Sequence, residues 1–272
     1  MTLQRRVLGS GDEWSAIHAV CTADRRTPRF EERHDRVCLA VVVRGTFLYR
    51  NAFGSALMVP GTVLLGNAGS CFECGHDHGK GDQCVSFHLT SSFLEDVARG
   101  IPGLRRAEFH RVHLPLGRSS VGLVAEAERS SGSNDTVRLE EYAIRIAASC
   151  LTLQDDLRVA GTPSGRDTRR INDVVRLIDS DPQRAFSLAD LAHAARSSRF
   201  HFLRTFRQVV GVPPHQYLLT RRLMRACSQL KSGAASITVV AQDAGFNDLS
   251  AFNRHFKRAL GMTPNEFRRG SR

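Results

Sequence analysis

The 272-residue sequence lacks the features that mark membrane-spanning and exported proteins. It holds no run of about eighteen apolar residues, so we expect no helix that crosses a bilayer. The stretch from Met1 to Ser10 carries two arginines without the apolar segment that a secretory signal needs. The seven cysteines are an odd number, which argues against a framework of disulfides. Together these absences predict a cytoplasmic protein with reduced thiols.

Net charge is absent from the first part of the chain. Residues 1–165 contain 19 Lys and Arg and 19 Asp and Glu, whereas residues 166–272 contain 19 Lys and Arg but 8 Asp and Glu. The net charge of +11 therefore belongs to the C-terminal part. A basic domain joined to a neutral one indicates that only the basic domain meets a polyanion. Charge alone does not separate DNA from RNA, from a membrane surface or from a solvated basic face.

The N-terminal part has the pattern of a small all-β domain. Residues 37–43 form a continuous apolar run, and shorter runs follow at residues 46–50, 56–59, 62–65 and 84–89. Gly and Pro turn signals separate these runs. Short strands at close spacing predict a small antiparallel barrel or sandwich.

The residues on either side of these strands follow other patterns. Residues 1–36 are polar and weakly periodic, which predicts one or two short strands at the edge of the domain. From Ser91 onward, helical spacing predicts helices near residues 91–98, 121–130 and 137–153. The last two form a helical hairpin that either covers the barrel or makes a dimer interface. The predicted fold class is α+β, with an all-α C-terminal domain.

The C-terminal part contains an internal repeat with a spacing of fifty residues. Phe202, Arg204, Phe206, Gly211 and Pro214 recur as Phe252, Arg254, Phe256, Gly261 and Pro264, and Tyr217 recurs as Phe267. A repeat of this kind indicates one supersecondary unit used twice. The apolar spacing within each copy predicts two helices joined by a tight turn, as in a helix-turn-helix unit.

These patterns divide the chain into three parts. We assign residues 1–155 to an N-terminal domain of strands and helices, and residues 156–167, which are rich in Gly, Pro and Ser, to a linker. Residues 168–272 form the DNA-binding domain. Its helix-turn-helix units are predicted at residues 187–210 and 236–260.

The second helix of each unit is expected to present its polar face to the major groove of DNA. The outward positions are Arg199, Phe200, Leu203, Arg204, Arg207, Leu249, Ser250, Asn253, Arg254 and Lys257. The guanidinium groups of Arg204 and Arg254 match O6 and N7 of guanine, and Asn253 matches adenine. The apolar members suit thymine methyl groups, while Arg207 and Lys257 suit phosphates. For a single arginine the alternative is a solvated surface charge, but the repeat on a basic domain favours DNA.

The segment from Ser187 to Arg269 resembles the DNA-binding domain of the AraC/XylS family of transcription regulators. The residues that match the family are Ile237 through Ala241, Ala244 to Phe246, Phe252 to Arg254, Phe256 to Arg258 and Gly261 to Pro264. The resemblance implies two reading helices that enter successive major grooves, in a regulator rather than an enzyme. It leaves RNA polymerase open as a partner.

The first unit departs from the family pattern at two positions. Arg196 stands where the turn usually has glycine, and Leu203 stands where a polar, base-contacting side chain is common. If the turn needs a positive φ, arginine costs about 1 kcal/mol relative to glycine. We therefore expect the second unit to be the stronger base reader.

A group of soft ligands lies near the end of the predicted β domain. Its members are Cys71, Cys74, His76, His78 and Cys84, with Glu73 and Asp82 nearby. Such ligands suit Zn²⁺ or another transition metal. Two alternatives stay open: redox sensing through a disulfide, which needs a depressed thiol pKa, and a Gly-rich loop with buried thiols. No cofactor is otherwise predicted.

The N-terminal part also resembles, less closely, the cupin-like sensor barrel that often precedes this DNA-binding domain. Gly45, the Pro60-Gly61 turn and the spacing of His76 and His78 carry the resemblance. It implies a homodimeric regulator that responds to a small-molecule or metal effector. His76, His78 and Asp82 also suggest a metal-dependent oxygenase, although no second metal motif follows. A further alternative is a structural, nucleoid-type DNA binder.

Overall fold

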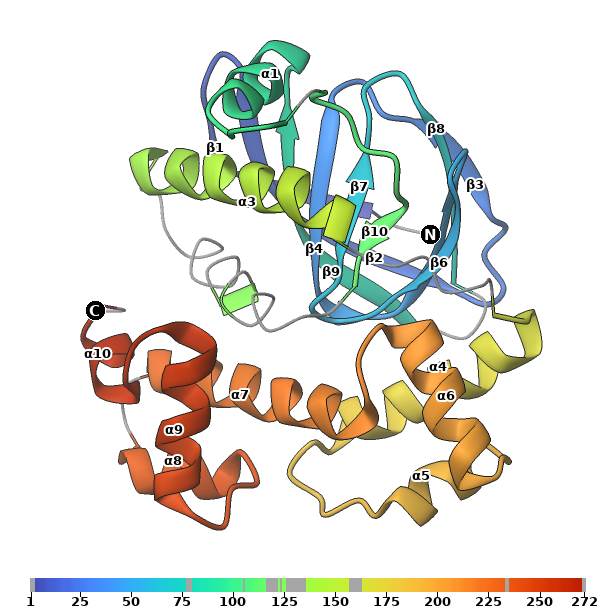
Figure 1. The fold of residues 1–272 in the computed structure, drawn as a ribbon, viewed down its shortest axis with the longest axis vertical. Coiled ribbons are helices and arrows are strands. Elements are labelled where there is room, and N and C mark those ends of the chain that lie inside the picture. Colours follow the sequence, from blue (N-terminus) through green and yellow to red (C-terminus); the bar gives the residue numbers. More distant parts are fainter. Residues whose placement is uncertain are drawn as a thin grey trace. The chain divides into compact units, whose positions relative to one another are not determined.

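The computed structural model describes residues 3–76, 80–104, 106–115, 122, 124–125, 136–156, 163–232 and 235–270 (Figure 1). The chain divides into two compact units. One consists of Met1–Pro115 with Glu126–Gly161, and the other of Leu116–Ala125 with Thr162–Arg272. Of the residues just before 126, Ala125 is described and lies in the core of the C-terminal helices. Within the described residues, no helix is long and apolar enough to cross a membrane.

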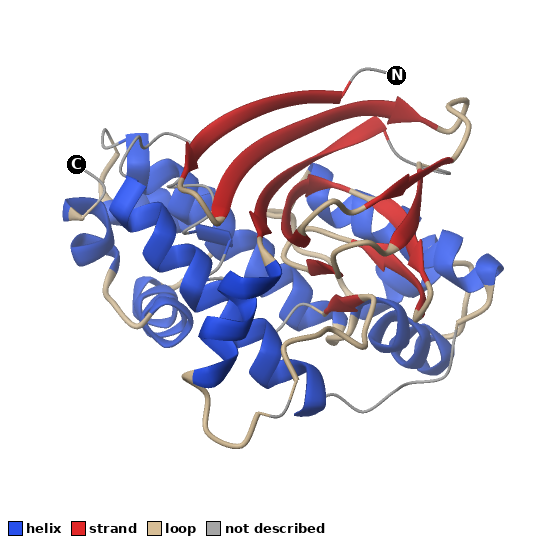
Figure 2. Cartoon of the chain, turned by 90° about the horizontal axis from the view of Figure 1, so that it is seen from above, coloured by secondary structure: helices blue, strands red, loops and turns tan. Residues whose placement is uncertain are grey.

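The N-terminal unit is built on two antiparallel sheets. Its strands are β1 (Leu3–Ser10), β2 (Trp14–Asp24), β3 (Phe30–Arg33), β4 (Val37–Gly45), β5 (Phe47–Asn51), β6 (Gly54–Met58), β7 (Val63–Gly66), β8 (Cys71–Gly75), β9 (Lys80–Leu89) and β10 (His113–Leu114). The larger sheet has the order β1-β2-β9-β4-β7-β10, and the smaller has the order β3-β8-β5-β6. The long strands of the larger sheet curve strongly (Figure 2).

The two sheets pack face to face around one apolar core. Side chains of β4 and β9 meet side chains of β5, β6 and β8 in this core, and Cys38, Ala40 and Cys84 lie opposite Tyr49 and Cys74. The other face of the larger sheet packs against helix α3 (Thr136–Asp156), where Phe87 and Tyr142 meet edge to face at 5.0 Å. Because β4 is covered on both faces, its sequence is a continuous apolar run and does not alternate. Helix α1 (Ser91–Arg99) packs against α3.

The antiparallel strands predicted from the sequence are confirmed, but two details differ. In the described residues the strands form two sheets and do not close into one barrel. Residues 1–36 form three strands instead of one or two, and β2 lies inside the larger sheet, paired with both β1 and β9. Only part of β2 is fully buried, so its apolar alternation is weak in the sequence. The helix predicted at residues 121–130 falls largely outside the described residues.

The C-terminal unit is entirely helical where it is described. Its helices are α4 (Gly165–Ser180), α5 (Leu188–Ala194), α6 (Arg199–Val210), α7 (Pro214–Ser232), α8 (Ile237–Asp243), α9 (Leu249–Leu260) and α10 (Pro264–Arg269). A capping box formed by Ser187 and Asp190 stands at the start of α5. Helix α10 was not predicted; it begins with Pro264 and has its own capping box, formed by Thr263 and Glu266.

The repeat in the sequence is a repeat in the core. In the first unit Phe202 contacts Phe206 at 5.5 Å between ring centroids, and Phe206 contacts Tyr217 at 5.9 Å. The second unit has the same chain of rings, with Phe252 to Phe256 at 5.5 Å and Phe256 to Phe267 at 5.6 Å. These aromatic side chains are fully buried. They therefore hold the helices together and are not available to stack on bases.

Candidate nucleic-acid interface

The two helix pairs α5–α6 and α8–α9 share one turn geometry. In the first turn the amide of Arg196 donates to the carbonyl of His193, and the amide of Ser197 donates to the carbonyl of Ala192. In the second turn the amides of Gly245 and Phe246 make the equivalent bonds to Gln242 and Ala241. Each pair of bonds closes the end of the leading helix and turns the chain toward the second helix.

The residue after the C-cap of the leading helix has a left-handed backbone conformation in both turns. Gly245 has φ +89° and Arg196 has φ +49°, and Arg196 is the one non-glycine residue with positive φ among those described. The condition for the expected cost at Arg196, a positive φ, is therefore met. At Gly245 a β-carbon would lie 2.8 Å from Cα of Gln183, so glycine is required there for space as well as for conformation.

Side-chain caps fix the start of each second helix. Ser198 accepts a hydrogen bond from the amide of His201 at the start of α6. Asp248 accepts from the amides of Ser250 and Ala251 at the start of α9. The second turn, residues 244–248, is one residue longer than the first, residues 195–198. The carboxylate cap and the longer turn are features of the second unit alone.

Every residue predicted to contact DNA lies on an exposed face of α6 or α9. The exposed members are Arg199, Phe200, Leu203, Arg204 and Arg207 on α6, and Leu249, Ser250, Asn253, Arg254 and Lys257 on α9. Phe200 is 80% exposed, an unusual state for so large an apolar side chain. Exposure is a condition for base contact, and the contacts themselves stay a prediction.

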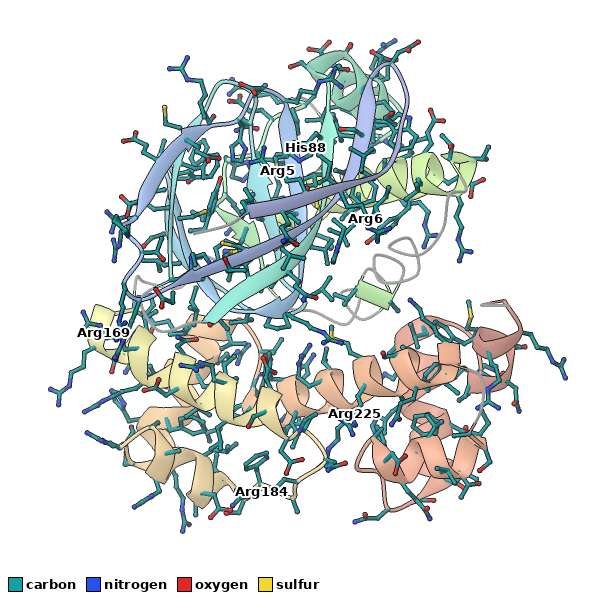
Figure 3. The ribbon with its side chains drawn as sticks, turned by 180° about the vertical axis from the view of Figure 1, so that it is seen from behind. Arg5, Arg6, His88, Arg169, Arg184 and Arg225 are labelled. Atoms are coloured by element: carbon teal, nitrogen blue, oxygen red, sulfur yellow. The ribbon has the colours of Figure 1, made fainter. Side chains whose placement is uncertain are left out.

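Helix α7 ties the two helix pairs to each other. Arg222 donates to the carbonyls of Pro182 and Arg184, at 2.8 and 3.1 Å, in the segment that leads into α5. One turn further on, Arg225 donates from Nε to the carbonyl of Asp243 at the end of α8, at 3.0 Å (Figure 3). Arginines of α7 thus satisfy backbone carbonyls of both units. Nineteen residues at 1.5 Å each give α7 a length of about 28 Å, close to the roughly 34 Å of one turn of B-DNA.

A largely buried ion pair anchors α4 to α7. Oδ1 of Asp179 accepts from Nε of Arg221 at 2.7 Å and from the hydroxyl of Tyr217 at 2.9 Å. Burial raises the pKa of Asp179, while Arg221 and Tyr217 act in the opposite direction. The pair holds the first helix of the domain on the helix that joins both units.

The structure separates the Cys and His residues that the sequence grouped in the N-terminal unit. Cys71 is exposed, whereas Cys74 and Cys84 are buried in the core between the sheets. Successive side chains of a strand point to opposite faces, so Cys71 and Cys74 on β8 lie on different faces. His76 is buried, and His78 lies outside the described residues.

His76 instead meets two residues from the larger sheet. Its Nε2 donates to Oδ2 of Asp82 at 2.6 Å, and one donor atom of each of Cys21, His76 and Asp82 lies within 4.8 Å of the others. Burial lowers the pKa of His76, but hydrogen bonds to Asp82 and Cys21 outweigh burial and raise the pKa to about 9. Sequence reasoning missed Cys21, because only the register that pairs it with Asp82 brings it to the site.

The redox alternative meets an electrostatic obstacle. All seven cysteines are free thiols. Burial raises the pKa of the Cys74 and Cys84 thiols, and the carboxylate of Asp82 raises both further. A high pKa suppresses the thiolate, which is the reactive form in disulfide exchange. These two thiols are poorly suited to redox sensing.

The paired units define a helix-turn-helix protein, and sequence comparison agrees. The family described as "Helix-turn-helix domain" matches residues 191–270. A putative AraC-like transcription regulator of Streptomyces lividans is 33% identical over 111 residues, which are 41% of this chain and 36% of that protein. The regulator MtrA of Neisseria gonorrhoeae is 25% identical over 46% of this chain and 42% of its own length. The chain thus spans about two fifths of these relatives.

A shorter relative is matched over most of its length. The TetD protein of transposon Tn10 from Escherichia coli is 31% identical over 102 residues, which cover 74% of that protein. The chain belongs to the AraC/XylS family of transcription regulators. The relatives whose names state a role are transcription regulators and not enzymes.

Two solved structures match this chain with low TM-scores. The DNA-binding domain of AdpA, in complex with a target DNA, is 33% identical and covers 37% of this chain and 91% of its own, with a TM-score of 0.36. Apo ToxT from Vibrio cholerae, a point variant, is 13% identical and covers 96% of this chain and 98% of its own, with a TM-score of 0.41. Both TM-scores are low, so the family rests on the sequence matches.

Proposed function

We propose that this protein is a sequence-specific, DNA-binding transcription regulator in which α6 and α9 enter successive major grooves. The observation that carries the proposal is the repeated, exposed basic face on two helices that lie on either side of α7 in the chain, a helix about 28 Å long. Arg204 and Arg254 are at equivalent positions on these faces and suit guanine. A role on DNA fits a protein of the cytoplasm.

The two reading helices are proposed to differ in specificity. On α9, Ser250, Asn253 and Arg254 offer hydrogen-bonding groups that distinguish base pairs in the major groove. On α6, Phe200 and Leu203 offer apolar contacts, which suit thymine methyl groups and carry less information. We therefore assign most of the base specificity to α9 and a larger share of positioning to α6.

Replacement of Arg254 tests the assignment. Arg254→Ala is expected to lower affinity for the operator about 5- to 100-fold and to relax the preference at one guanine, because the bidentate contact is lost. Gel-shift titrations at fixed salt, against the operator and against random DNA, measure both effects. Arg169→Ala is the matched control, since it removes the same charge from an exposed position on α4.

A structural, nucleoid-type binder gives a different result in the same titrations. It binds operator and random DNA with similar affinity, because phosphate contacts dominate. Equal losses for Arg254→Ala and Arg169→Ala, with no change in base preference, would sink the assignment of Arg254.

We further propose that the N-terminal unit is a cupin-like sensor that responds to a small-molecule or metal effector and forms the homodimer. The curved antiparallel sheets and the pocket at one end support a ligand-binding role. An effector changes the regulator only if it binds one state better than the other. Gel shifts of full-length protein with and without each effector test whether effector binding is coupled to operator binding. An operator affinity that no metal or ligand changes would contradict this coupling. Analytical ultracentrifugation tests the dimer separately.

Metal sensing is the second candidate function, and a specific arrangement favours it. Cys21, His76 and Asp82 bring three different metal-binding groups together. Within the predicted cluster, His76 belongs to this arrangement and the carboxylate of Asp82 connects it to Cys84. Zn²⁺ or another transition metal suits the donors. An oxygenase is disfavoured by the regulators among the relatives.

A further inference from the structure

Three potential metal ligands meet at one end of the N-terminal sandwich. Cys21 lies on β2, Asp82 on β9 and His76 directly after β8, so both sheets contribute. Cys21 and Asp82 are register partners on adjacent strands, which places their side chains on the same face. Donor atoms of all three residues lie within 4.8 Å of one another.

Cys21 and His76 are buried and Asp82 is nearly so, which is costly for polar groups. Cys21 and His76 have 7% and 4% of their surface exposed, and the side chain of Asp82 is 9% exposed. The ring of Phe47 stacks on His76 with 5.9 Å between centroids. Buried carboxylates and imidazoles are retained where they pair with each other or coordinate a metal. The His76–Asp82 hydrogen bond meets part of that requirement, and the thiol of Cys21 is the third donor.

Two glycines let the backbones around the site approach closely. A β-carbon on Gly81 would lie 2.0 Å from the carbonyl oxygen of Cys21. A β-carbon on Gly45 would lie 2.3 Å from the carbonyl oxygen of Gly81 and 2.7 Å from Cα of Asp82. Both glycines have φ +76°, which other residues rarely adopt. The backbone that carries Cys21 and Asp82 is therefore packed too tightly to shift freely, which pre-organises the two ligands.

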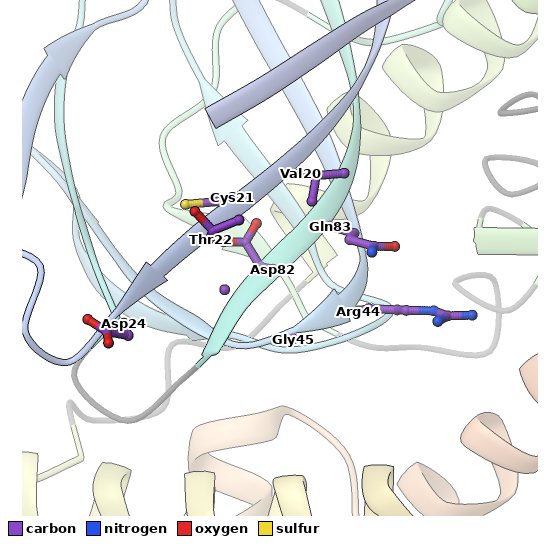
Figure 4. Close-up of a pocket in the computed structure, with 9 residues that line it drawn as sticks. Val20, Cys21, Thr22, Asp24, Arg44, Gly45, Asp82 and Gln83 are labelled. Atoms are coloured by element: carbon purple, nitrogen blue, oxygen red, sulfur yellow. The ribbon is translucent and has the colours of Figure 1, made fainter. Parts of the chain in front are cut away.

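A pocket gives an ion a path to the site. It has a volume of about 500 Å³, and its lining includes Cys21, Asp82 and Gly45 (Figure 4). Figure 4 shows Cys21 and Asp82 next to each other on neighbouring strands at the pocket wall. Thr22, Asp24 and Gln83 also line the pocket and add polar groups. The pocket thus borders two of the three donor residues, Cys21 and Asp82.

We propose that Cys21, His76 and Asp82 bind one divalent transition-metal ion, with a fourth coordination position open to the pocket. This inference rests on the proposed function and names the metal effector site within it. One thiolate, one imidazole and one carboxylate suit Zn²⁺, Co²⁺ or Fe²⁺, whereas Mg²⁺ and Ca²⁺ prefer oxygen ligands throughout. Binding replaces the Cys21 S–H bond with an S–metal bond and the His76–Asp82 hydrogen bond with N–metal and O–metal bonds, and the protons go to solvent.

Cys84 has a positioning role in this arrangement. Its thiol donates to Oδ1 of Asp82 at 3.3 Å, the carboxylate oxygen that does not contact His76. A hydrogen bond to a ligating carboxylate fixes its orientation. Cys71, by contrast, is exposed on the outer face of β8 and takes no part.

Metal titration of the full-length protein tests the site without DNA. Chelator-treated protein is titrated with Co²⁺, whose thiolate charge-transfer absorption reports a Co–S bond, and Zn²⁺ is then added in competition. We expect about one equivalent of metal, displaced by Zn²⁺. Cys21→Ser and Asp82→Asn should each weaken binding at least about tenfold, and Cys21→Ser should abolish the charge-transfer band. Cys71→Ser is the matched control and should bind as the unmodified protein does.

A second measurement distinguishes loss of the metal site from loss of folding in the variants. Zn²⁺ should raise the Tm of the unmodified protein and of Cys71→Ser but not that of Cys21→Ser, because a ligand stabilises only the state that binds it. Absence of stoichiometric metal, or loss of the thiolate band in Cys71→Ser with retention in Cys21→Ser, would overturn the proposal. Operator binding is measured separately, so a failed metal site leaves the DNA-binding proposal standing.

Discussion

Single residues decide the geometry of the two turns. Arg196 and Gly245 occupy equivalent left-handed positions, but only glycine adopts this conformation without strain. The cost at Arg196 was foreseeable, because the family resemblance aligned it with a glycine. With Arg196 in the turn, the first helix-turn-helix unit is less stable than it would be with glycine at that position.

Exchange at the two turns should change stability in opposite directions. Arg196→Gly is expected to raise the free energy of unfolding of the C-terminal unit by about 0.5–1 kcal/mol. Relief of the strain in the folded state outweighs the greater freedom that glycine gives the unfolded chain. Gly245→Ala should lower that free energy by at least about 1 kcal/mol, since a β-carbon also meets Gln183. Urea unfolding followed by circular dichroism measures both. A destabilised Arg196→Gly would show that the arginine side chain stabilises the turn.

His34 should make the N-terminal unit sensitive to acid. Its ring contacts the hydroxyl of Tyr49 at 2.9 Å and stacks on Phe72 at 4.1 Å between centroids. Burial, and then the nearby His88, lower the pKa of His34 from 6.5 to about 4, against the opposing effect of Asp35. Between pH 6.5 and 4 the unfolded chain therefore binds a proton that the folded chain does not, and stability falls as the pH falls.

We expect this residue to contribute about 1–3 kcal/mol to the loss between those pH values. His34→Gln retains a polar group toward Tyr49 but does not titrate. Its free energy of unfolding, measured by urea titration at several pH values, should depend less steeply on pH than that of the unmodified protein. The same pH dependence of the free energy of unfolding in both proteins would contradict the lowered pKa of His34.

At the scale of elements, α7 is the structural link of the C-terminal unit. Its arginines bond backbone carbonyls near α5 and α8, and Arg221 pairs with Asp179 on α4. The helix therefore sets the distance between the reading helices through polar contacts as well as through its length. A flexible connection of the same length would not fix that distance.

Removal of Arg221 should loosen α4. Arg221→Met is expected to cost about 1–3 kcal/mol, because it leaves the largely buried carboxylate of Asp179 with Tyr217 as its remaining partner in this network. In the double variant with Asp179→Asn, the cost should be smaller than the sum of the single costs by about 1–3 kcal/mol. Denaturant unfolding of the four proteins gives this coupling energy, and additive costs would show that the pair contributes no net stability.

The sequence predicted the helices better than the strands, for a physical reason. Caps such as Ser198 and Ser236 are local signals in the sequence, and α6 and α8 begin directly after them. The order of the strands depends on pairing between distant segments, which residues 1–36 do not reveal. The same limit hid Cys21, whose role depends on the register between β2 and β9.

At the scale of the whole molecule, a neutral sheet-rich unit precedes a basic helical one. The division of charge, visible in the sequence, coincides with the division of the fold. It assigns DNA binding to the helical C-terminal unit. The exposed faces of α6 and α9 were also predictable, because the apolar repeat defines the buried face. The lining of the pocket was not predictable, since residues such as Arg44 and Gln83 come together only in the folded sheet.

The central claim is that two unequal reading helices recognise one bipartite DNA sequence. Selection of binding sites from a random DNA library, followed by sequencing, tests it on full-length protein, Arg204→Ala and Arg254→Ala. The unmodified protein should select two short elements about one helical turn apart, or about 10 base pairs between centres. Arg254→Ala should lose a guanine from the more strongly selected element, and Arg204→Ala should change the weaker one. Selection of no common sequence, or of the same sequence by all three proteins, would contradict the claim.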